Sequence, residues 1–422
     1  MALNGPDPRG YTFHKQPNYP EVPYAEYTAR LSKIQSLMAE NGVDCLLLWS
    51  RQNIRYFLGF ESIHWWLPSL QPAVGIIPQK GEPIVVVPEF FRGAVESLCW
   101  VRNILGQKNP HQPKSQRELP VEVADVVKEN GYGGKNIGLE MGPLGCMWIP
   151  RPLNDIESLK NALSDAKFVD GDKVIWGCRM IKSPLEIERI RKAVAGIRVI
   201  MSAMVEEYRP GMTEVDVAGI AHRKAAELEG SFLGDNAFGT FGHLVASGDK
   251  DMTADVMAHE GATIGKGDRI WADITYNYKG YMPDQSRIWQ IGPITKEIMR
   301  NYEMVWDAQD RAAGILKPGV KANELYHAMV EPILAAGRSV SDMGGHGIGL
   351  DMHEPPSIDA WNEMTIEEGM VLSLERWMHG TGASQSHEGE VHIQDTYVVT
   401  DKGCDKLQGF NRDIIQVSPP IL

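Results

Sequence analysis

The chain has 422 residues, of which 43% are hydrophobic and 23% are charged, and its formal net charge is −13 at pH 7. This length exceeds what one hydrophobic core ordinarily serves, so we expect two domains. The negative charge disfavours nucleic acids and anionic membranes as partners, because both attract basic surfaces. No apolar run approaches the roughly 18 to 20 residues that a membrane-spanning helix needs, so we expect no membrane span.

Residues 1–23 are polar and proline-rich, and we expect them to form an irregular N-terminal arm. The arm lacks the basic start and the apolar stretch of a secretory signal peptide, which favours a cytoplasmic location. An odd number of scattered cysteines suits a reducing compartment and argues against a disulfide framework or a cysteine zinc site. The cysteines are Cys45, Cys99, Cys146, Cys178 and Cys404.

Helix and strand signals alternate over the first part of the chain. An apolar stripe predicts a helix over 24–41, which Gly42 ends. The stripe consists of Leu31, Ile34, Leu37 and Met38. Short apolar runs then predict strands, and the alternation predicts an α/β domain over residues 24–175. The predicted strands cover residues 43–49, 73–77, 84–87, 136–139 and 166–169.

The second domain, residues 176–422, begins with a strong helix signal. Ser183 at the N-cap, Pro184 directly after it and Glu186 three residues on predict a capping box. The helix that follows should end before Pro210 and Gly211.

Two short patterns recur within this second domain. Residues 209–212 (RPGM) and 317–320 (KPGV) each stand between predicted helices, 108 residues apart when counted from 209 to 317. Residues 267–273 and 369–375 each contain a turn glycine, a strand and a final carboxylate, 102 residues apart when counted from 267 to 369. The common order and similar spacing predict an internal duplication with a pseudo-twofold axis, which brings Asp273 and Glu375 together.

A hairpin is predicted around Lys279 and Gly280, with strands over 270–277 and from residue 281 onward. Asp273 and Asp284 lie on its two arms, where cross-strand pairing can bring their carboxylates together. Two carboxylates in one buried site repel each other unless a proton or a cation compensates. Either acid alone fits an ordinary surface turn, whereas the pair favours a divalent-metal site.

Glycines surround His346 in the sequence GGHGIGL over 344–350. Glycine permits a close approach between the backbone and a ligand. A single histidine is more often a structural residue. Here His353 follows at once, just before Pro355 and Pro356, and two histidines in such a loop indicate a binding site.

These segments resemble the pita-bread metallopeptidase family of methionine aminopeptidase, aminopeptidase P and prolidase, with creatinase as a relative. GHGIGLDMHEPP resembles its histidine motif, DITYNYKGYMPDQSR its two-aspartate motif, and EEGMVLSLE the strand that ends in its ligand glutamate. The first domain, including NIRYFLGF over 53–60, resembles the creatinase/prolidase N-terminal domain. Methionine aminopeptidases lack that domain, so the prolidase, aminopeptidase P and creatinase branch fits best. The resemblance implies an α+β pita-bread fold for the second domain.

The resemblance also implies one or two divalent metal ions, of manganese, zinc, cobalt or iron, and a homodimer. By that resemblance Asp273 chelates one ion, Asp284 bridges both, and His346 and Glu375 bind the other. His353 and Glu375 are the implied catalytic residues, and His353 would contact the substrate carbonyl or the tetrahedral intermediate. The ions would lower the pKa of a bridging water, so that a hydroxide is present at neutral pH, and would polarise the carbonyl, as in other two-metal hydrolases.

One departure from the family concerns the fifth metal ligand. Where the family has a second bridging glutamate, the strand VHIQDT has Gln394. An amide oxygen can bind one cation but is neutral and bridges two poorly, so we expect weaker affinity for at least one ion. Asp395 points to the opposite strand face, whereas His392 shares the face of Gln394 and can approach the site.

A second departure lies ahead of the turn at Gly267. The family carries a histidine at a position where this sequence has Asp255 and Val256, and His243 and His259 are out of register. The missing histidine argues against a metal-free creatinase mechanism. It also weakens a simple prolidase assignment, because that histidine helps to bind substrate in the family.

Three further side chains are candidate substrate contacts. Trp65 and Trp66 lie in a loop that, in family dimers, reaches the partner's site. They either cap an apolar or cationic substrate or pack at a domain or dimer contact. Arg287, shortly after Asp284, is expected to pair with the site carboxylates.

The leading interpretation is a metal-dependent hydrolase of a C–N bond, similar to Xaa-Pro peptidases, that acts on a short peptide or a small molecule. Three alternatives stay open: a metal-dependent lyase similar to dimethylsulfoniopropionate lyases, a creatinase-like amidinohydrolase or amidohydrolase, and a non-catalytic binding protein. Retention of most of the ligands argues against the binding protein. The sequence does not determine the substrate.

Overall fold

The computed structural model describes residues 22–66, 71–106, 119–142, 153–228, 243–247, 258–379, 390–407 and 409–417. The chain forms two compact units, Met1–Arg179 and Met180–Leu422. The boundary expected after residue 175 falls within helix α6 (Asp172–Arg179). Most of the expected N-terminal arm lies outside the described residues. No helix in the described ranges is both long and apolar enough to cross a bilayer.

The N-terminal unit contains a six-stranded sheet in the order β4-β3-β2-β1-β5-β6. Strand β1 pairs antiparallel with β2 and parallel with β5, and helices accompany the sheet, as expected for an α/β unit. The strands are β1 (Cys45–Leu48), β2 (Val74–Pro78), β3 (Ile84–Val87), β4 (Asn103–Gly106), β5 (Asn136–Leu139) and β6 (Lys167–Asp170). The other helices of this unit are α1 (Tyr24–Glu40), α2 (Arg51–Leu58), α3 (Arg92–Leu98), α4 (Leu119–Glu129) and α5 (Leu153–Ala162), with short 3-10 turns η1 (Ile63–Trp66) and η2 (Glu89–Phe91).

The first helix and most of the strands were predictable from their apolar residues. In α1 the predicted Leu31, Ile34 and Met38 are buried, whereas Leu37 is only partly buried. The chain leaves the helix at Gly42 with a φ of 66°. Strands β3 and β5 have the predicted bounds. Strand β4 was not predicted, because its two apolar residues, Ile104 and Leu105, are too few to give a strand pattern.

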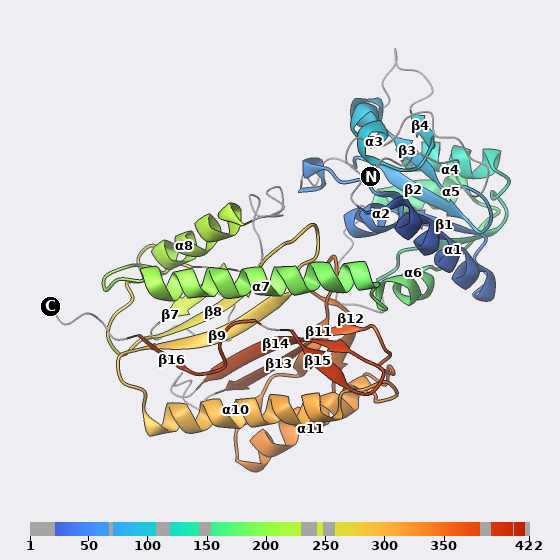
Figure 1. Cartoon of the computed structure of the whole chain (residues 1–422). Helices are drawn as coiled ribbons and strands as arrows, with labels where there is room; N and C mark the ends of the chain where they lie inside the picture. The colour runs from blue at the N-terminus through green and yellow to red at the C-terminus, as the bar shows by residue number, and fades with distance from the viewer. Residues whose placement is uncertain are drawn as a thin grey trace. The chain divides into compact units, whose positions relative to one another are not determined.

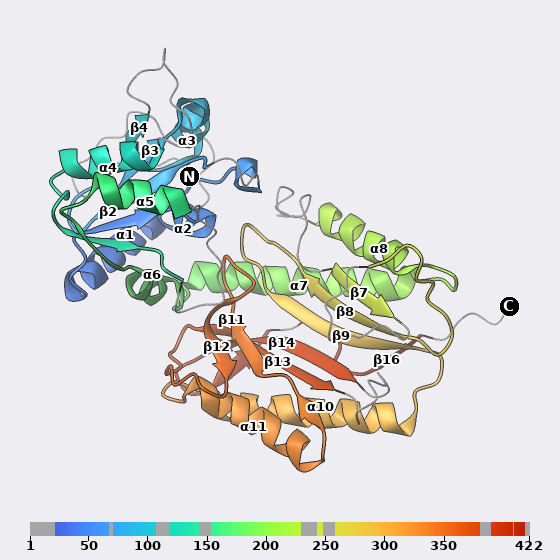
Figure 2. The same cartoon turned by 180° about the vertical axis from the view of Figure 1, so that it is seen from behind.

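The C-terminal unit contains two sheets with helices on their outer sides. One sheet has the order β16-β9-β8-β7 and the other β12-β11-β13-β14-β15, with β10 paired to β13. In both views α7 packs against β8 and β9, and α10 packs against β13 and β14 (Figures 1 and 2). The helices are α7 (Pro184–Glu207), α8 (Glu214–Glu227), α10 (Lys296–Ile315) and α11 (Ala322–Ala335). The strands are β7 (His243–Ser247), β8 (Arg269–Thr275), β9 (Asp284–Ile291), β10 (Ser339–Val340), β11 (Met343–Gly347), β12 (Glu354–Asp359), β13 (Val371–His379), β14 (Val391–Val399), β15 (Cys404–Lys406) and β16 (Ile415–Val417).

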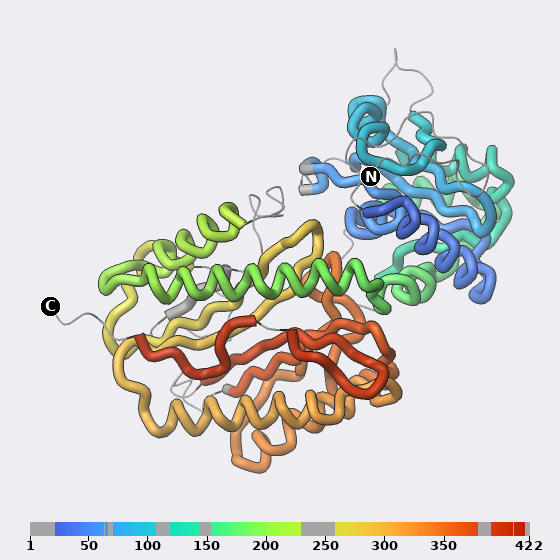
Figure 3. Tube along the Cα trace, viewed as in Figure 1, coloured from blue at the N-terminus to red at the C-terminus, as the bar shows by residue number. Residues whose placement is uncertain are grey.

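The internal duplication predicted from the sequence is confirmed by two matching bridges. Thr213 pairs with Thr263, and Lys321 pairs with Thr365, both antiparallel. Thr213 and Lys321 are the N-cap residues of α8 and α11, so each bridge ties the start of a second helix to a later loop. The bridged residues are 108 positions apart (213 to 321) and 102 positions apart (263 to 365), as in the sequence patterns. Figure 3 follows the chain through the first copy in green and yellow and the second in orange and red.

The predicted capping box begins α7. The backbone N–H of Glu186 donates to Ser183 Oγ at 3.3 Å, and the N–H of Ser183 donates to Glu186 Oε2 at 2.9 Å. Pro184 occupies the first helical position, where no intrahelical N–H bond is lost. This start therefore fixes where the longest helix of the first copy begins.

Replacing the cap should weaken the protein measurably. We expect Ser183→Ala to lower the free energy of unfolding by about 1 kcal/mol, because a helix N–H loses its acceptor. The matched variant Ser183→Asp keeps an acceptor at this position and should lie close to the wild type in urea unfolding. Equal losses in both variants would contradict the capping role.

Candidate metal centre

The first copy presents two aspartates on one face of a hairpin. Strands β8 and β9 pair so that Thr275 lies opposite Asp284 and Asp273 lies opposite Ser286. Because side chains alternate along a strand, Asp273 and Asp284 point to the same face. The turn between the strands contains Lys279 and Gly280, both with positive φ, as predicted. Asp284 is buried and Asp273 is partly buried.

The second copy presents its site residues on one face in the same way. Glu375 on β13 lies opposite Gln394 on β14, and His346 on β11 lies opposite Ser373. Alternation places Glu375, Gln394 and His346 on a common face. His346 and Gln394 are buried.

Two of the site carboxylates approach one imidazole nitrogen of His346. Nε2 of His346 lies 3.5 Å from Asp284 Oδ2 and 3.8 Å from Glu375 Oε2. Nδ1 of His346 lies 3.0 Å from the carbonyl oxygen of Gly347, so Nδ1 carries a hydrogen and donates it. A lone pair on Nε2 would then face two anionic oxygens, with the amide Nε2 of Gln394 also 3.3 Å away. The arrangement therefore calls for a cation, either a proton or a metal ion, between these three atoms.

The raised pKa of His346 likewise indicates that this site favours a positive charge. Burial by itself lowers this pKa, but the Asp284 and Glu375 carboxylates outweigh burial and raise it to about 9. Without a metal ion, a proton on Nε2 compensates the two carboxylates at neutral pH.

Glu375 is held by a second histidine that the sequence had placed on this face. His392 Nε2 lies 2.9 Å from Glu375 Oε1. Burial raises the pKa of Glu375, but the hydrogen bond from His392 and the neighbouring His346 outweigh it and lower the pKa to about 2. Glu375 is therefore an anion at neutral pH.

His353 stacks on His346, with ring centroids 3.8 Å apart and planes inclined by 30°. Burial, followed by the proximity of His346, lowers the pKa of His353 to about 4, so its imidazole is neutral at neutral pH. Among the described residues, Asp284, His346 and His353 offer ligand atoms that all lie within 4.8 Å of one another.

The donor set fits a divalent cation. Asp284 Oδ1 and Gln394 Oε1 are buried and accept no hydrogen bond within the part of the chain that the structure describes. Buried polar atoms of this kind are rare unless an ion or a ligand satisfies them. Carboxylate, imidazole and amide groups suit divalent ions such as manganese, zinc, cobalt and iron.

The glycines around His346 serve the fold more directly than a ligand. Gly345 has a φ of 139°, and a Cβ at this position would collide with the backbone oxygen of Ser373 on the neighbouring strand. A Cβ on Gly347 would collide with the backbone oxygen of Pro355. The described neighbours of these glycines are thus the flanking strands β13 and β12, whose close approach places His346 in the site. The expectation that the glycines also admit a ligand stays a prediction.

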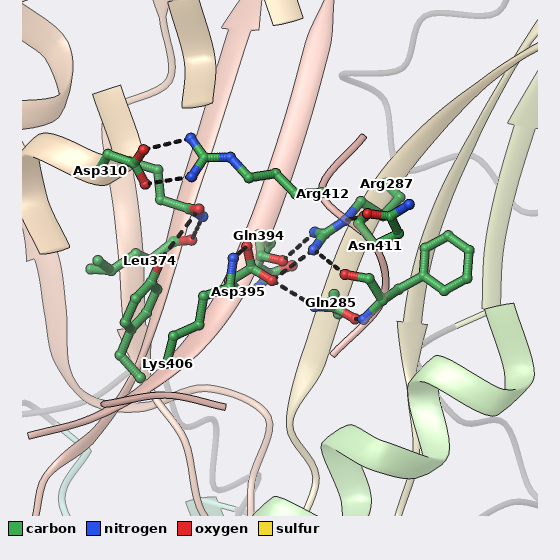
Figure 4. A network of polar contacts seen from close by, with 12 residues as sticks. Gln285, Arg287, Asp310, Leu374, Gln394, Asp395, Lys406, Asn411 and Arg412 are labelled. Carbon is green, nitrogen blue, oxygen red and sulfur yellow. Dashed lines mark hydrogen bonds and ion pairs between the residues drawn. The ribbon is translucent and has the colours of Figure 1, made fainter. Parts of the chain in front are cut away.

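The prediction that Arg287 pairs with the site carboxylates is wrong. Strand alternation turns Arg287 away from Asp284, and its Nη2 lies 2.7 Å from Asp395 Oδ1, with both side chains fully buried (Figure 4). Nη1 of Arg287 donates to the backbone oxygens of Ser286 at 2.8 Å and Gln394 at 2.9 Å. Arg287 therefore joins β9 to β14 from behind the site.

The remaining candidates lie elsewhere. Trp65 packs near Phe60 in the N-terminal unit, with ring centroids 6.2 Å apart. Contact of Trp65 and Trp66 with substrate stays a prediction. His259 is exposed, and its Nδ1 accepts a hydrogen bond from the N–H of Gly261 at 2.9 Å. Asp255 and Val256, which stand in place of the family histidine, lie outside the described residues.

The sequence matches two protein families. Residues 188–401 match Metallopeptidase family M24, and residues 30–181 match the Creatinase/Prolidase N-terminal domain. An Xaa-Pro dipeptidase of Pyrococcus horikoshii is 28% identical over 397 residues, which cover 92% of this chain and 98% of that relative. An Xaa-Pro dipeptidase of Pyrococcus furiosus is 27% identical over 400 residues, covering 92% of this chain and 99% of the relative.

Solved structures share the fold over the same span. A prolidase from Pyrococcus horikoshii has a TM-score of 0.75 at 25% identity and covers 92% of this chain and 100% of its own. An Xaa-Pro dipeptidase from Bacillus anthracis has a TM-score of 0.77 at 23% identity, covers 92% of this chain and 99% of its own, and supports the fold alone. The predicted combination of a creatinase/prolidase-like domain and a pita-bread domain is confirmed.

The buried ion pair behind the site should be far more important for stability than a neighbouring exposed pair. We expect Arg287→Leu to lower the free energy of unfolding by about 3–5 kcal/mol, because it removes the fully buried cationic partner of Asp395 and leaves only Lys406 to compensate this carboxylate. Arg412→Leu is the matched control, since Arg412 pairs with Asp310 at the surface and lies over the same Trp306 ring.

The control should lose at most about 1 kcal/mol, as exposed ion pairs usually do. Urea unfolding of both full-length variants measures the difference. Similar losses in the two variants would contradict the role assigned to Arg287.

Proposed function

Because the chain belongs to Metallopeptidase family M24, we propose that it is a metal-dependent hydrolase of peptide C–N bonds that acts on Xaa-Pro dipeptides. One observation carries the proposal: Asp284 and Glu375 both approach Nε2 of a buried histidine, His346. The named Xaa-Pro dipeptidases that match over nearly the whole chain support the choice of substrate.

We assign the metal ligands to both copies of the duplicated unit. Asp273 and Asp284 come from the first copy, and His346, Glu375 and Gln394 from the second. One or two divalent ions held there would supply Lewis acidity and an activated hydroxide at neutral pH.

The protein's own groups have separable roles in this proposal. Glu375 is anionic at neutral pH and its Oε2 faces the metal position, so it would hold an ion there and help to orient the water bound to that ion. His353 is neutral, so one ring nitrogen can donate a hydrogen bond to the substrate carbonyl or to the tetrahedral intermediate. His346 and Asp284 are buried, and charge interactions are stronger at buried positions than in water.

Gln394 should make the two metal positions unequal. Its amide oxygen is neutral, so the position between two ions lacks one negative charge that a glutamate would bring. We infer one tightly bound ion and one weakly bound ion. The homodimer and the cytoplasmic location expected from the sequence stay predictions.

Metal analysis joined to a substrate screen tests the function. Protein purified with added Mn²⁺ or Zn²⁺ should contain about one to two metal equivalents per subunit and hydrolyse Xaa-Pro dipeptides. Chelation should abolish turnover, and metal should restore it. The screen should include N-acyl and guanidino compounds, because turnover of those compounds alone would replace the dipeptide proposal with a creatinase-like activity.

A metal-free protein that turns over dipeptides at an undiminished rate would contradict the proposal. Asp284→Asn tests the site within the protein, since it keeps the size of the side chain and removes the charge. It should remain folded and lose both metal and activity.

Changing Gln394 should change the weaker metal position. We expect Gln394→Glu to tighten binding of the second Mn²⁺ ion by about tenfold or more, because a full charge near the ion replaces a dipole. Gln394→Met, similar in size but without the oxygen, should weaken it. Calorimetric titration of the metal-free proteins with Mn²⁺ measures the series, and equal affinities and stoichiometries would refute the placement of Gln394.

A further inference from the structure

A second layer of side chains lies along the same face as the proposed ligands. Each of the strands β8, β9, β13 and β14 carries one ligand and, two residues away, one member of this layer. Because the spacing is two, each member points to the same face as its ligand. The layer consists of Trp271 beside Asp273, Ser286 beside Asp284, Trp377 beside Glu375, and His392 beside Gln394.

His392 is the centre of this layer and is 1% exposed. Its ring stacks on Trp377, with centroids 4.7 Å apart and planes inclined by 14°. Its Nδ1 lies 3.0 Å from Trp271 Nε1 and 3.0 Å from Ser286 Oγ. The Trp271 Nε1 also lies 2.7 Å from Ser286 Oγ. Trp377 of the second copy therefore contacts the face of the His392 ring, and Trp271 and Ser286 of the first copy contact its edge.

These contacts decide which nitrogen of His392 carries the hydrogen. The indole N–H of Trp271 can only donate, and the hydroxyl of Ser286 can donate as well. Nδ1 of His392 consequently accepts, and the hydrogen of the neutral ring resides on Nε2. Nε2 then donates to Glu375 Oε1 at 2.9 Å.

The two carboxylate oxygens of Glu375 thus have different partners. Oε1 accepts the hydrogen bond from His392, whereas Oε2 lies 3.8 Å from His346 Nε2, on the side of the metal position. A carboxylate held in this way offers one oxygen to an ion and cannot rotate to offer the other without losing the bond to His392.

We propose that His392 is a positioning residue that fixes Glu375 as a one-oxygen metal ligand, with Trp271 and Ser286 selecting its tautomer. This inference rests on the metal site proposed above, and it adds a dependence between the duplicated copies. Two strands of the first copy set the hydrogen position of a histidine that orients a ligand of the second copy.

Gln394 should make metal binding more sensitive to the orientation of Glu375 than it would be with a glutamate at position 394. With a neutral amide at one ligand position, fewer carboxylates hold the ion, so each one contributes a larger share of the binding free energy. Partners of metal ligands typically contribute about tenfold to a hundredfold in metal affinity.

A matched pair of variants tests the proposal in the full-length protein. His392→Met removes the N–H and keeps a similar side-chain length, and we expect Mn²⁺ affinity to fall about tenfold to a hundredfold in calorimetric titration. His392→Gln places an amide N–H where Nε2 stands and should recover most of the wild-type affinity. His327→Ala, an exposed histidine on α11, is the control and should not change Mn²⁺ binding.

A second variant addresses the tautomer and covers the case in which His392→Met does not fold. Trp271→Phe combined with Ser286→Ala removes both donors that face Nδ1 while His392 stays in place. We expect Mn²⁺ affinity to fall severalfold, and unchanged affinity in this folded double variant would overturn the tautomer selection.

The outcomes separate this inference from the proposed function. If the wild type binds no Mn²⁺, the metal site itself fails. If the wild type binds Mn²⁺ and His392→Met binds it equally well, only the role of His392 is overturned. Equal losses in His392→Met and His392→Gln would also overturn it, because the N–H would then not be the group that matters.

Discussion

The C-terminal unit is organised around one electrostatic constraint: Asp284 and Glu375 both approach Nε2 of the buried His346. Anionic oxygens and a nitrogen lone pair cannot share a buried space without a cation between them. A proton can satisfy this constraint. A divalent ion can satisfy it together with Asp284 Oδ1 and Gln394 Oε1, which accept no hydrogen bond from the described residues. The atoms that would destabilise the folded site in the absence of a cation are therefore the same atoms that would bind the metal of a metallopeptidase.

The duplicated architecture explains how this constraint is met with few residues. Strands β9 and β14, one from each copy, lie side by side and carry site residues on their front face. On their back face, Arg287 binds Asp395 and the backbone oxygen of Gln394 (Figure 4). The back face thus fixes the separation of two strands whose front faces hold Asp284 and Gln394. On the front face, the second layer around His392 likewise joins strands from the two copies.

Much of this organisation could be read from residue spacing. Glycine-bounded strands that end in Asp273 and Glu375, together with the repeated helix junctions, predict the duplication, and the structure reproduces both separations. The capping box at Ser183 and the common face of Gln394 and His392 follow from local rules that tertiary contacts do not change.

Other features depend on partners that the sequence does not order in space. Arg287 is adjacent in sequence to the site, but its direction is set by strand alternation and its partner lies more than a hundred residues away. Gly345 is explained by the backbone of Ser373, which only sheet pairing brings close. Trp271 and Ser286 have no motif of their own; their two-residue spacing from Asp273 and Asp284 was the available signal.

Anomalous diffraction from crystals soaked in Mn²⁺ would locate the metal position. We expect a peak that lies among Asp284, His346 Nε2 and Glu375 Oε2, with Glu375 Oε1 still bound to His392. Crystals that take up Mn²⁺ at other positions and show no peak among these three residues would contradict this expectation.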